Sequence, residues 1–272
     1  MAEANPHTGF QDPRRANLFV QIYLILRQNL VTIFRRPEAI LPPIGISLFF
    51  LLIYDSTLGE AAGFIPNLGT NDYLGFILPL SIVSSSLSGA GIAAQNLVRN
   101  IESGYFDKIL LTPVYRFALL TGTILAGGLI LALQAGIVVG MGLILGLQSA
   151  TGMMGLLAVI GLALLLGLGF AGFTMSAALG SGNAAVTQSA GFIFFPLTFL
   201  APTFVPLELL DGWLKTVARI NPITYVLEAM RATLNQGWDP GALSRSVLAS
   251  GILGVLMYLL TLLALQRRTR RA

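Results

Sequence analysis

No Asp, Glu, Lys or Arg occurs between Phe117 and Leu207, and this long charge-free stretch constrains the fold more than any other feature. About 20 apolar residues in a helix cross a hydrocarbon core of ~30 Å. The stretch is therefore long enough for three membrane-spanning helices with short turns. Over the whole chain of 272 residues, 55% are hydrophobic and 10% are charged, which is far from the composition of a soluble domain. The sequence predicts an all-α integral membrane protein.

Shorter charge-free runs on both sides bring the expected number of membrane-spanning helices to six. The expected spans are Ala39–Tyr54, Tyr73–Val98, Phe117–Leu147, Met153–Leu179, Ser189–Val205 and Ser246–Gln266. We divide the chain into residues 1–38, a cytoplasmic tail with an interfacial helix, and residues 39–272, a six-helix transmembrane domain. Residues 1–16 are polar and do not resemble a signal peptide, because the apolar segment that follows begins late and includes Arg27.

The segment Leu18–Arg36 has the pattern of an amphipathic helix that lies in the membrane interface. On a helical wheel, one narrow face is polar and the opposite face is apolar. The polar face consists of Asn17, Gln21, Gln28, Thr32 and Arg35, and the apolar face of Phe19, Ile22, Tyr23, Leu26, Leu30, Ile33 and Phe34. The alternative is a tilted first span, which is disfavoured by the cost of burying Arg27 and Asn29 in lipid.

The distribution of basic residues predicts that both termini are cytoplasmic. With six spans, twelve of the sixteen Lys and Arg residues lie on one side, in the N-terminal segment, the loop after the second span and the C-terminal tail. Cytoplasmic loops of membrane proteins carry an excess of Lys and Arg. We therefore expect a multi-pass protein of the plasma membrane, which is the inner membrane in a cell with two membranes.

Catalysis and carboxylate-coupled transport need side chains that this sequence lacks, although sodium could still bind backbone carbonyls at broken helices. A P-loop requires Gly-Lys followed by Ser or Thr, whereas Lys108 and Lys215 follow Asp107 and Leu214. The single histidine, His7, cannot form an HExxH zinc site, and the spans hold no carboxylate for an aspartyl dyad. Proton-coupled carriers usually place Asp, Glu or His inside the bundle. We expect no enzyme activity, cofactor or metal on this chain, and energy for active transport from another subunit.

The loop after the second span is the most informative polar segment. We expect a short helix from about Gly104, ended by Thr112-Pro113 because the residue before a proline avoids the α conformation. Its apolar face consists of Phe106, Ile109 and Leu110, and its water-facing side of Asp107 and Lys108. Such a helix can dock against a partner protein. The alternative is a surface turn that has no partner.

This loop resembles the cytoplasmic loop of the ABC-2 type exporter permeases. The sequence Glu-Ser-Gly-Tyr-Phe-Asp-Lys-Ile-Leu-Leu-Thr-Pro-Val, residues 102–114, has the family's acid, its glycine and its Leu-Leu-x-Thr-Pro-like end. Tyr105 stands where family members often have Glu or Arg. A second match is Asn221-Pro222-Ile223-Thr224-Tyr225, followed by Glu228-Ala229-Met230-Arg231, which is similar to the segment before the family's last span. The amphipathic N-terminal helix, the six spans and the outer loop before the sixth span also follow the family's order.

The resemblance implies a drug-resistance-like permease subunit that works with other proteins. Its partners would be a second permease subunit, expected to complete a homodimer, two ATP-binding-cassette ATPase subunits that hold ATP and Mg, and membrane lipid, but no nucleic acid. The N-terminal helix and the cytoplasmic loop would contact the ATPase. The coupling residues expected in this loop are Glu102, Gly104, Tyr105, Phe106, Asp107, Lys108, Leu110 and Pro113. Family substrates include drugs, lipids and lipid-linked polysaccharides.

Two short amphipathic helices are expected before the last span. They are Pro206–Ile220 and Ile223–Leu234, with Asn221 as the cap and Pro222 at the first position of the second helix. Glu228 and Arg231 are spaced for an i, i+3 ion pair. The residues of interest in this outer hairpin are Trp213, Asn221, Pro222, Tyr225, Glu228 and Arg231. Amphipathic helices fit two roles equally, an outer gate and an interfacial anchor.

Two sets of residues are candidates for lining a substrate path. Ser81, Ser84, Ser85 and Ser88 form a polar stripe on the second span. Phe195 and Phe199 belong to an aromatic, proline-kinked fifth span. Helix packing is the alternative role for both sets, and it also explains Gly136-xxx-Gly140 and Gly142-xxx-Gly146 in the third span.

The composition of this path favours one kind of substrate. Its polar residues are uncharged, so we predict outward movement of an amphiphilic drug or lipid by a permease that uses a separate ATPase. The alternatives are a permease for lipid-linked polysaccharide, and a secondary transporter or channel that has no ATPase partner.

Overall fold

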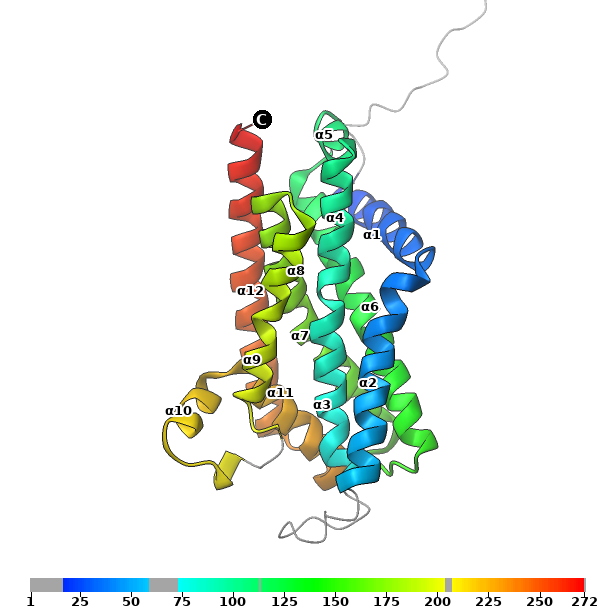
Figure 1. Cartoon of the computed structure of the whole chain (residues 1–272), viewed down its shortest axis with the longest axis vertical. Coiled ribbons are helices and arrows are strands. Elements are labelled where there is room, and N and C mark those ends of the chain that lie inside the picture. Colours follow the sequence, from blue (N-terminus) through cyan, green and yellow to red (C-terminus); the bar gives the residue numbers. More distant parts are fainter. Residues whose placement is uncertain (1–16, 59–72, 113, 204–206, 272) are drawn as a thin grey trace, which may run out of the picture.

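The structure is a computed structural model, which describes residues 17–58, 73–112, 114–203 and 207–271. The described residues form a bundle of helices without strands (Figure 1). The helices are α1 (Leu18–Phe34), α2 (Pro37–Leu58), α3 (Tyr73–Gly89), α4 (Gly91–Glu102), α5 (Tyr105–Leu110), α6 (Arg116–Ile144), α7 (Gly152–Ser181), α8 (Ala184–Phe192), α9 (Phe194–Phe199), α10 (Gly212–Ile220), α11 (Pro222–Arg231) and α12 (Pro240–Arg271). A 3-10 turn at Leu207–Leu209 precedes α10, and a π-helical turn at Ala232–Gln236 follows α11.

Four helical segments in the described part of the chain are long and apolar enough to cross a membrane. They are Leu74–Glu102, Arg116–Ile144, Gly152–Ser181 and Pro240–Arg270. Helices α1 and α2 pass the same test only as a pair, and they are bent by 74°. The apolar segment Ala184–Phe199 is shorter. The chain is therefore an all-helical, multi-pass membrane protein with four or five spans by this measure, and the expected count of six is not confirmed.

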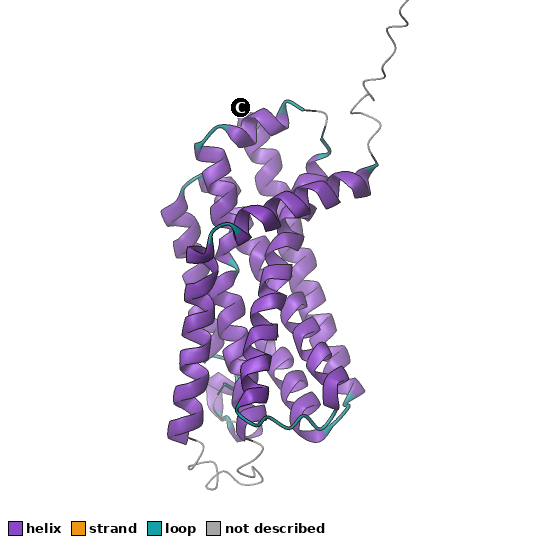
Figure 2. Ribbon diagram, turned by 90° about the vertical axis from the view of Figure 1, so that its right-hand side faces the viewer, coloured by secondary structure: helices purple, strands orange, loops and turns teal. Residues whose placement is uncertain are grey.

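Helix α1 lies across one end of the bundle, close to α6 (Figure 2). Gly122 of α6 leaves room for Ile25, because a Cβ at Gly122 would lie 2.8 Å from the Ile25 side chain. Asn29 donates a hydrogen bond to Thr123 Oγ1 (3.4 Å). Gln21, expected on the water-facing side of α1, is buried and accepts a hydrogen bond from the Tyr115 backbone N–H (2.9 Å). Part of the polar face of α1 thus binds the bundle instead of water.

The second expected span consists of α3 and α4, which meet at Ala90 and continue to Glu102. The carbonyl of Ala90 accepts a hydrogen bond from Thr174 Oγ1 of α7 (2.9 Å). This bond satisfies a backbone group at the break, where the regular helical pattern is interrupted. The α3–α4 pair still passes as one helical segment, Leu74–Glu102, and this bond attaches it to α7.

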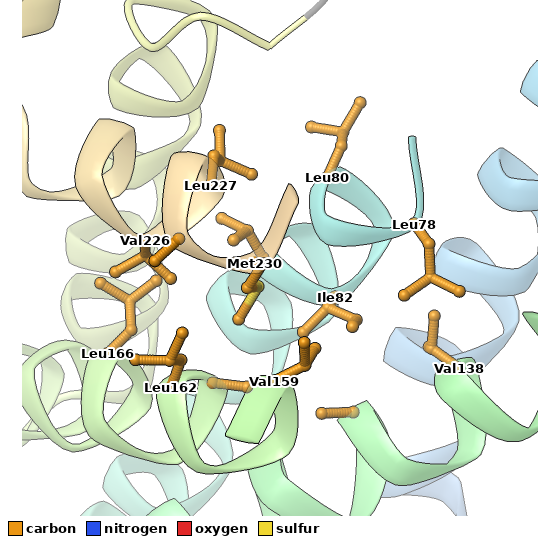
Figure 3. Packing of buried hydrophobic residues seen from close by; sticks show 14 of the residues in the cluster. Leu78, Leu80, Ile82, Val138, Val159, Leu162, Leu166, Val226, Leu227 and Met230 are labelled. Atoms are coloured by element: carbon orange, nitrogen blue, oxygen red, sulfur yellow. The ribbon is translucent and has the colours of Figure 1, made fainter. Parts of the chain in front are cut away.

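Helix α11 lies in the core of the bundle, not on its outer surface as its amphipathic pattern suggests. Val226, Leu227 and Met230 are fully buried. Figure 3 shows these side chains packed with residues of α3 and α7, among them Ile82 and Leu162. The amphipathic pattern of α11 therefore does not correspond to a face exposed to water. Two buried polar side chains of this helix, Thr224 and Arg231, donate hydrogen bonds to backbone carbonyls of neighbouring segments.

Helices α7 and α12 pack closely because glycines of α7 face α12. A Cβ at Gly172 would lie 3.1 Å from the Cβ of Met257, and Thr261 Oγ1 donates a hydrogen bond to the Gly172 carbonyl (2.7 Å). Small residues allow this approach in lipid-embedded bundles. In contrast, a Cβ at Gly136 would meet one atom 3.8 Å away, and one at Gly140 would meet nothing within 4 Å. The Gly136-xxx-Gly140 pattern is therefore not a close helix contact within the described chain.

Candidate functional site

A groove of about 550 Å³ follows one side of the bundle between α2, the α3–α4 pair and the α8–α9 pair. Four phenylalanines form much of its wall, namely Phe50, Phe192, Phe195 and Phe199. The wall also includes uncharged polar residues, namely Ser84, Gln95, Thr187, Gln188, Thr198 and Thr203. Glu38, in the first turn of α2, is the one charged residue among the described residues that line it. The groove is of a size typical for drug-sized ligands.

The local sequence explains why α8 and α9 border this groove. Gly182 adopts a left-handed conformation (φ 60°) that ends α7, and Asn183 then caps α8 by accepting a hydrogen bond from the Ala185 N–H (2.8 Å). The helix breaks again at Ile193. Pro196 contributes to this break, because a proline cannot donate the hydrogen bond to the carbonyl four residues earlier. The chain therefore turns back along the bundle and presents a short, broken helix.

The structure divides the expected substrate-path residues into two groups. Ser84, Phe195 and Phe199 line the groove, and the two phenylalanine rings lie 5.0 Å apart. Ser85 instead donates a hydrogen bond to the Ile82 carbonyl (2.8 Å), and Ser81 is buried outside the groove. The side chain of Ser88 lies outside the described residues. The serine stripe therefore serves helix packing as well as the groove surface.

Some residues that line the groove did not stand out in the sequence. Glu38 looks like an ordinary charged residue that flanks a span, and Thr187 and Gln188 precede the expected start of the fifth span at Ser189. Gln95 was a polar residue near the end of the second span. These residues share one feature in the sequence: each is a polar residue next to or inside an apolar segment. The sequence does not show that they lie together along one groove.

At the end of the bundle that carries the C-terminus, α5 forms the short helix expected in the polar loop (Figure 1). Gly104 has a positive φ of 70°, which suits glycine and allows the sharp turn from α4 into α5. Phe106 is 1% exposed and belongs to a buried apolar cluster that also includes Ile101, Leu119, Leu179 and Leu265. The expectation that the apolar face of α5 is free to bind a partner is therefore wrong for Phe106. Its ring fills a gap in the bundle's own core.

Other residues of this loop are exposed. Glu102, Tyr105, Lys108 and Leu111 face outward, and Leu111 is 88% exposed. Pro113 and the side chains of Asp107 and Leu110 lie outside the described residues. Leu111 is the large apolar residue of this loop that sequence reasoning missed, because a continuous apolar run such as residues 109–111 does not show which side chain stays outside.

Hydrogen bonds connect this loop to α1 and α12. Gln28 Nε2 of α1 donates to the hydroxyl of Tyr105 (2.9 Å), and Arg116 Nη1 donates to Thr269 Oγ1 of α12 (3.1 Å). The guanidinium carbon of Arg268 lies 5.9 Å from the centre of the Phe106 ring. The loop, α1 and the end of α12 thus form one continuous surface. We call Glu102, Tyr105, Lys108 and Leu111 the α5 surface.

The opposite end of the bundle is held together by Arg231, at the end of α11. Its guanidinium donates hydrogen bonds to the carbonyls of Phe76 (3.0 Å), Pro202 (2.6 Å) and Thr203 (2.6 Å). Burial lowers the pKa of Arg231 to about 9, while the Glu228 carboxylate acts in the opposite direction. The guanidinium therefore stays protonated at neutral pH. The expected ion-pair spacing contributes an attraction, but the hydrogen bonds of Arg231 go to backbone carbonyls.

The remaining residues of the outer hairpin lie as follows. Asn221 caps α11 as expected, since its Oδ1 accepts a hydrogen bond from the Ile223 N–H (3.0 Å), and Pro222 occupies the first turn. Asn221 Nδ2 also donates to the Leu197 carbonyl of α9 (2.6 Å). The Tyr225 hydroxyl donates to the Arg219 carbonyl (2.5 Å), and Trp213 on α10 is 71% exposed. Asn221 and Arg231 thus connect the hairpin to the segment that borders the groove.

The sequence of this chain matches a known protein family over most of its length. The profile described as ABC-2 type transporter matches residues 20–235, which is most of the chain. The chain belongs to the ABC-2 type transporter family. ABC-2 permeases work with an ATP-binding subunit, and the relatives of this chain are transport permeases, not catalytic enzymes.

Relatives with curated names agree with this assignment. The chain is 26% identical over 211 residues to the "Daunorubicin resistance ABC transporter permease protein DrrB1" of Streptomyces coeruleorubidus, covering 75% of this chain and 72% of that protein. It is 24% identical over 217 residues to the "Probable doxorubicin resistance ABC transporter permease protein DrrC" of Mycobacterium tuberculosis, covering 79% and 78%. It is 23% identical over 202 residues to the "Inner membrane transport permease YadH" of Escherichia coli, covering 71% and 74%. The expectation of a permease similar to drug-resistance transporters is confirmed.

Proposed function

We propose that this ABC-2 permease moves an amphiphilic, drug-like or lipid-like compound outward across the plasma membrane, driven by ATP hydrolysis on a separate subunit. The observation that carries the proposal is the side groove, which combines four phenylalanines with uncharged polar groups. Such a wall suits a compound with a large apolar part and a few polar groups. Drug-resistance permeases among the relatives agree with this class of substrate.

The α5 surface is the proposed site of ATPase contact. It belongs to an end of the bundle where basic residues are numerous, among them Lys108, Arg116, Arg267, Arg268 and Arg270. Figure 1 places α5 and the C-terminus together at this end, with α10 at the opposite end. The excess of Lys and Arg supports a cytoplasmic position for this end and for both termini. On this orientation, α1 lies at the cytoplasmic interface and the Arg231 contacts lie toward the outside.

Movement at the α5 surface has a direct route to the groove. Helix α5 is joined to α4 by the turn at Gly104, and α4 is joined to α3 at Ala90. Gln95 on α4 and Ser84 on α3 both line the groove. A shift of α5 during the ATPase cycle therefore reaches the groove wall through a single helical segment. Coupling of this kind needs a physical element that both sites bias, and the α3–α4 pair is that element.

A second permease subunit is the proposed cover of the open side of the groove. Phe192, Ile193, Phe195 and Phe199 on α8 and α9 are each more than half exposed. Two copies of the chain facing each other would bury these residues and enclose the groove between them. The α8–α9 segment with the residues that follow would supply the sixth crossing in this arrangement.

Two other functions predict different behaviour. A carrier for lipid-linked polysaccharide needs many hydrogen-bonding groups, whereas four phenylalanines form much of the groove wall. A secondary transporter or channel would work without an ATPase. The phenylalanines of the groove argue against the polysaccharide carrier. Membership of a family that uses ATP-binding subunits argues against a transporter without an ATPase.

The test is transport by the purified complex in vesicles. The permease should co-purify with an ATP-binding-cassette ATPase, and ATP should drive an amphiphilic dye across the membrane. Gly191→Trp should stop transport, because Gly191 lines the groove and a Cβ there meets nothing within 4 Å, so the new ring fills the groove without displacing the backbone. Transport in the absence of the ATPase, or full transport by Gly191→Trp, would contradict the proposal.

A further inference from the structure

We propose that the groove selects amphiphiles that carry one positive charge, with the cation held at Glu38 and the apolar part held against the phenylalanines. This inference rests on the proposed role of the groove as the substrate path. It goes further because it names the charge of the substrate and the side chain that recognises it.

The charge pattern of the groove is the first observation. Glu38 is the one ionisable residue among the described residues that line it, and no Lys or Arg lines it. Arg35 and Arg36 precede α2 in sequence, but neither borders the groove. A carboxylate beside a mainly apolar wall attracts a cation and repels an anion.

The availability of Glu38 is the second observation. Its side chain is exposed, and within the described part of the chain it has neither a hydrogen-bond partner nor an ion-pair partner. It lies in the first turn of α2, where the helix dipole favours a negative charge. The Glu38 side chain is therefore accessible to a ligand in the groove.

The aromatic wall is the third observation. Phe50 from α2 and Phe192, Phe195 and Phe199 from α8 and α9 approach the groove from two sides. Phenyl faces bind apolar and aromatic surfaces and also attract cations. Gln95 and Gln188 add amide groups that can bind polar substituents. A ligand with a cationic end and a flat apolar body matches both parts of this wall.

The experiment uses the permease with its ATPase in vesicles and a pair of probes that differ in charge. The probes are trimethylammonium-diphenylhexatriene, a permanent cation, and the uncharged diphenylhexatriene. We expect the native complex to move the cation faster. Glu38→Gln should lower the rate for the cation by about tenfold, and Glu38→Asp should keep most of it. The rate for the uncharged probe should change little in both variants.

Two further variants make the outcomes distinct. Asp211→Asn removes a carboxylate that is exposed on the outer hairpin, does not line the groove and makes no capping bond, so it should change neither rate. Gly191→Trp should abolish movement of both probes. If Gly191→Trp stops both probes and Glu38→Gln affects neither, the cation proposal is overturned while the substrate path stands. If Gly191→Trp affects neither probe, the path itself is overturned. Equal loss of both probes in Glu38→Gln would also overturn charge selection.

Discussion

The guanidinium carbon of Arg231 lies 3.7 Å from the centre of the Phe76 ring. This contact joins the end of α11 to the first turn of α3, while the hydrogen bonds of Arg231 hold the chain that follows α9. A planar guanidinium suits this position, because it can stack on an aromatic face and donate several hydrogen bonds in its own plane. One charged side chain therefore fixes three segments at the end of the bundle opposite α5.

We predict that Arg231→Lys destabilises the permease although the charge is retained. An ammonium group cannot stack on Phe76 and reach three carbonyls in the same geometry, so we expect a loss of about 2–3 kcal/mol. Thermal unfolding in detergent should show a lower midpoint. The control is Arg219→Lys, which alters an exposed side chain on α10 and should leave the midpoint unchanged. An unchanged midpoint for Arg231→Lys would mean that its contacts are not needed for stability.

Truncation of Phe106 should lower the stability of the permease, whereas truncation of Leu111 should lower stimulation of the ATPase. Phe106→Ala leaves a cavity in the core and should cost about 3–5 kcal/mol in stability. Leu111→Ala removes an exposed side chain, so it should leave stability intact and reduce stimulation of the partner ATPase. Thermal unfolding and ATP hydrolysis by the reconstituted complex measure the two effects. Normal ATPase stimulation in Leu111→Ala would remove this residue from the proposed contact.

The contact between α7 and α12 can be tested at its closest point. Gly172→Val should cost about 1–3 kcal/mol, because the new side chain would press on Met257 and separate the hydrogen-bonded pair of Gly172 and Thr261. Gly161→Val on the same helix is the matched control, since a Cβ there meets nothing within 4 Å. Thermal unfolding should separate the two variants. Equal stability would show that α12 can move away without cost.

The proposed orientation predicts a clear labelling pattern. The chain contains no cysteine, so a single introduced cysteine is unique. Gln148→Cys, in the exposed turn between α6 and α7, should react with a membrane-impermeant maleimide added to intact cells. Ser103→Cys, between α4 and α5, should react only after the cells are made permeable. The reverse pattern would invert the permease and remove the α5 surface from the cytoplasm.

Local features were predictable from the sequence. The charge-free run gave the positions of α6 and α7, and Asn221-Pro222 gave the start of α11, because capping and hydropathy depend on neighbouring residues. The short helix in the cytoplasmic loop also follows from local pattern. The ends of the fifth expected span were less predictable, since the turn at Gly182-Asn183 starts α8 before Ser189 and a proline interrupts it.

The residues that each side chain contacts in the folded protein were not predictable from local sequence. Phe106 and Leu111 are both apolar residues of one loop, yet the first is buried and the second is exposed. The spacing of Glu228 and Arg231 predicted their attraction, but it did not predict the hydrogen bonds of Arg231 to backbone carbonyls of distant segments. Such contacts depend on how distant segments pack.

The sequence by itself determined that this chain is a helical membrane protein, because burying a charge in lipid costs free energy at each position along the chain. Its resemblance to the ABC-2 permeases came from the motifs of residues 102–114 and 221–231. Only the tertiary structure decided that α11 enters the core and that Glu38 borders an aromatic groove. The physical reason is that lipid is as apolar as a protein interior, so hydropathy does not distinguish a side chain that faces lipid from one that faces another helix.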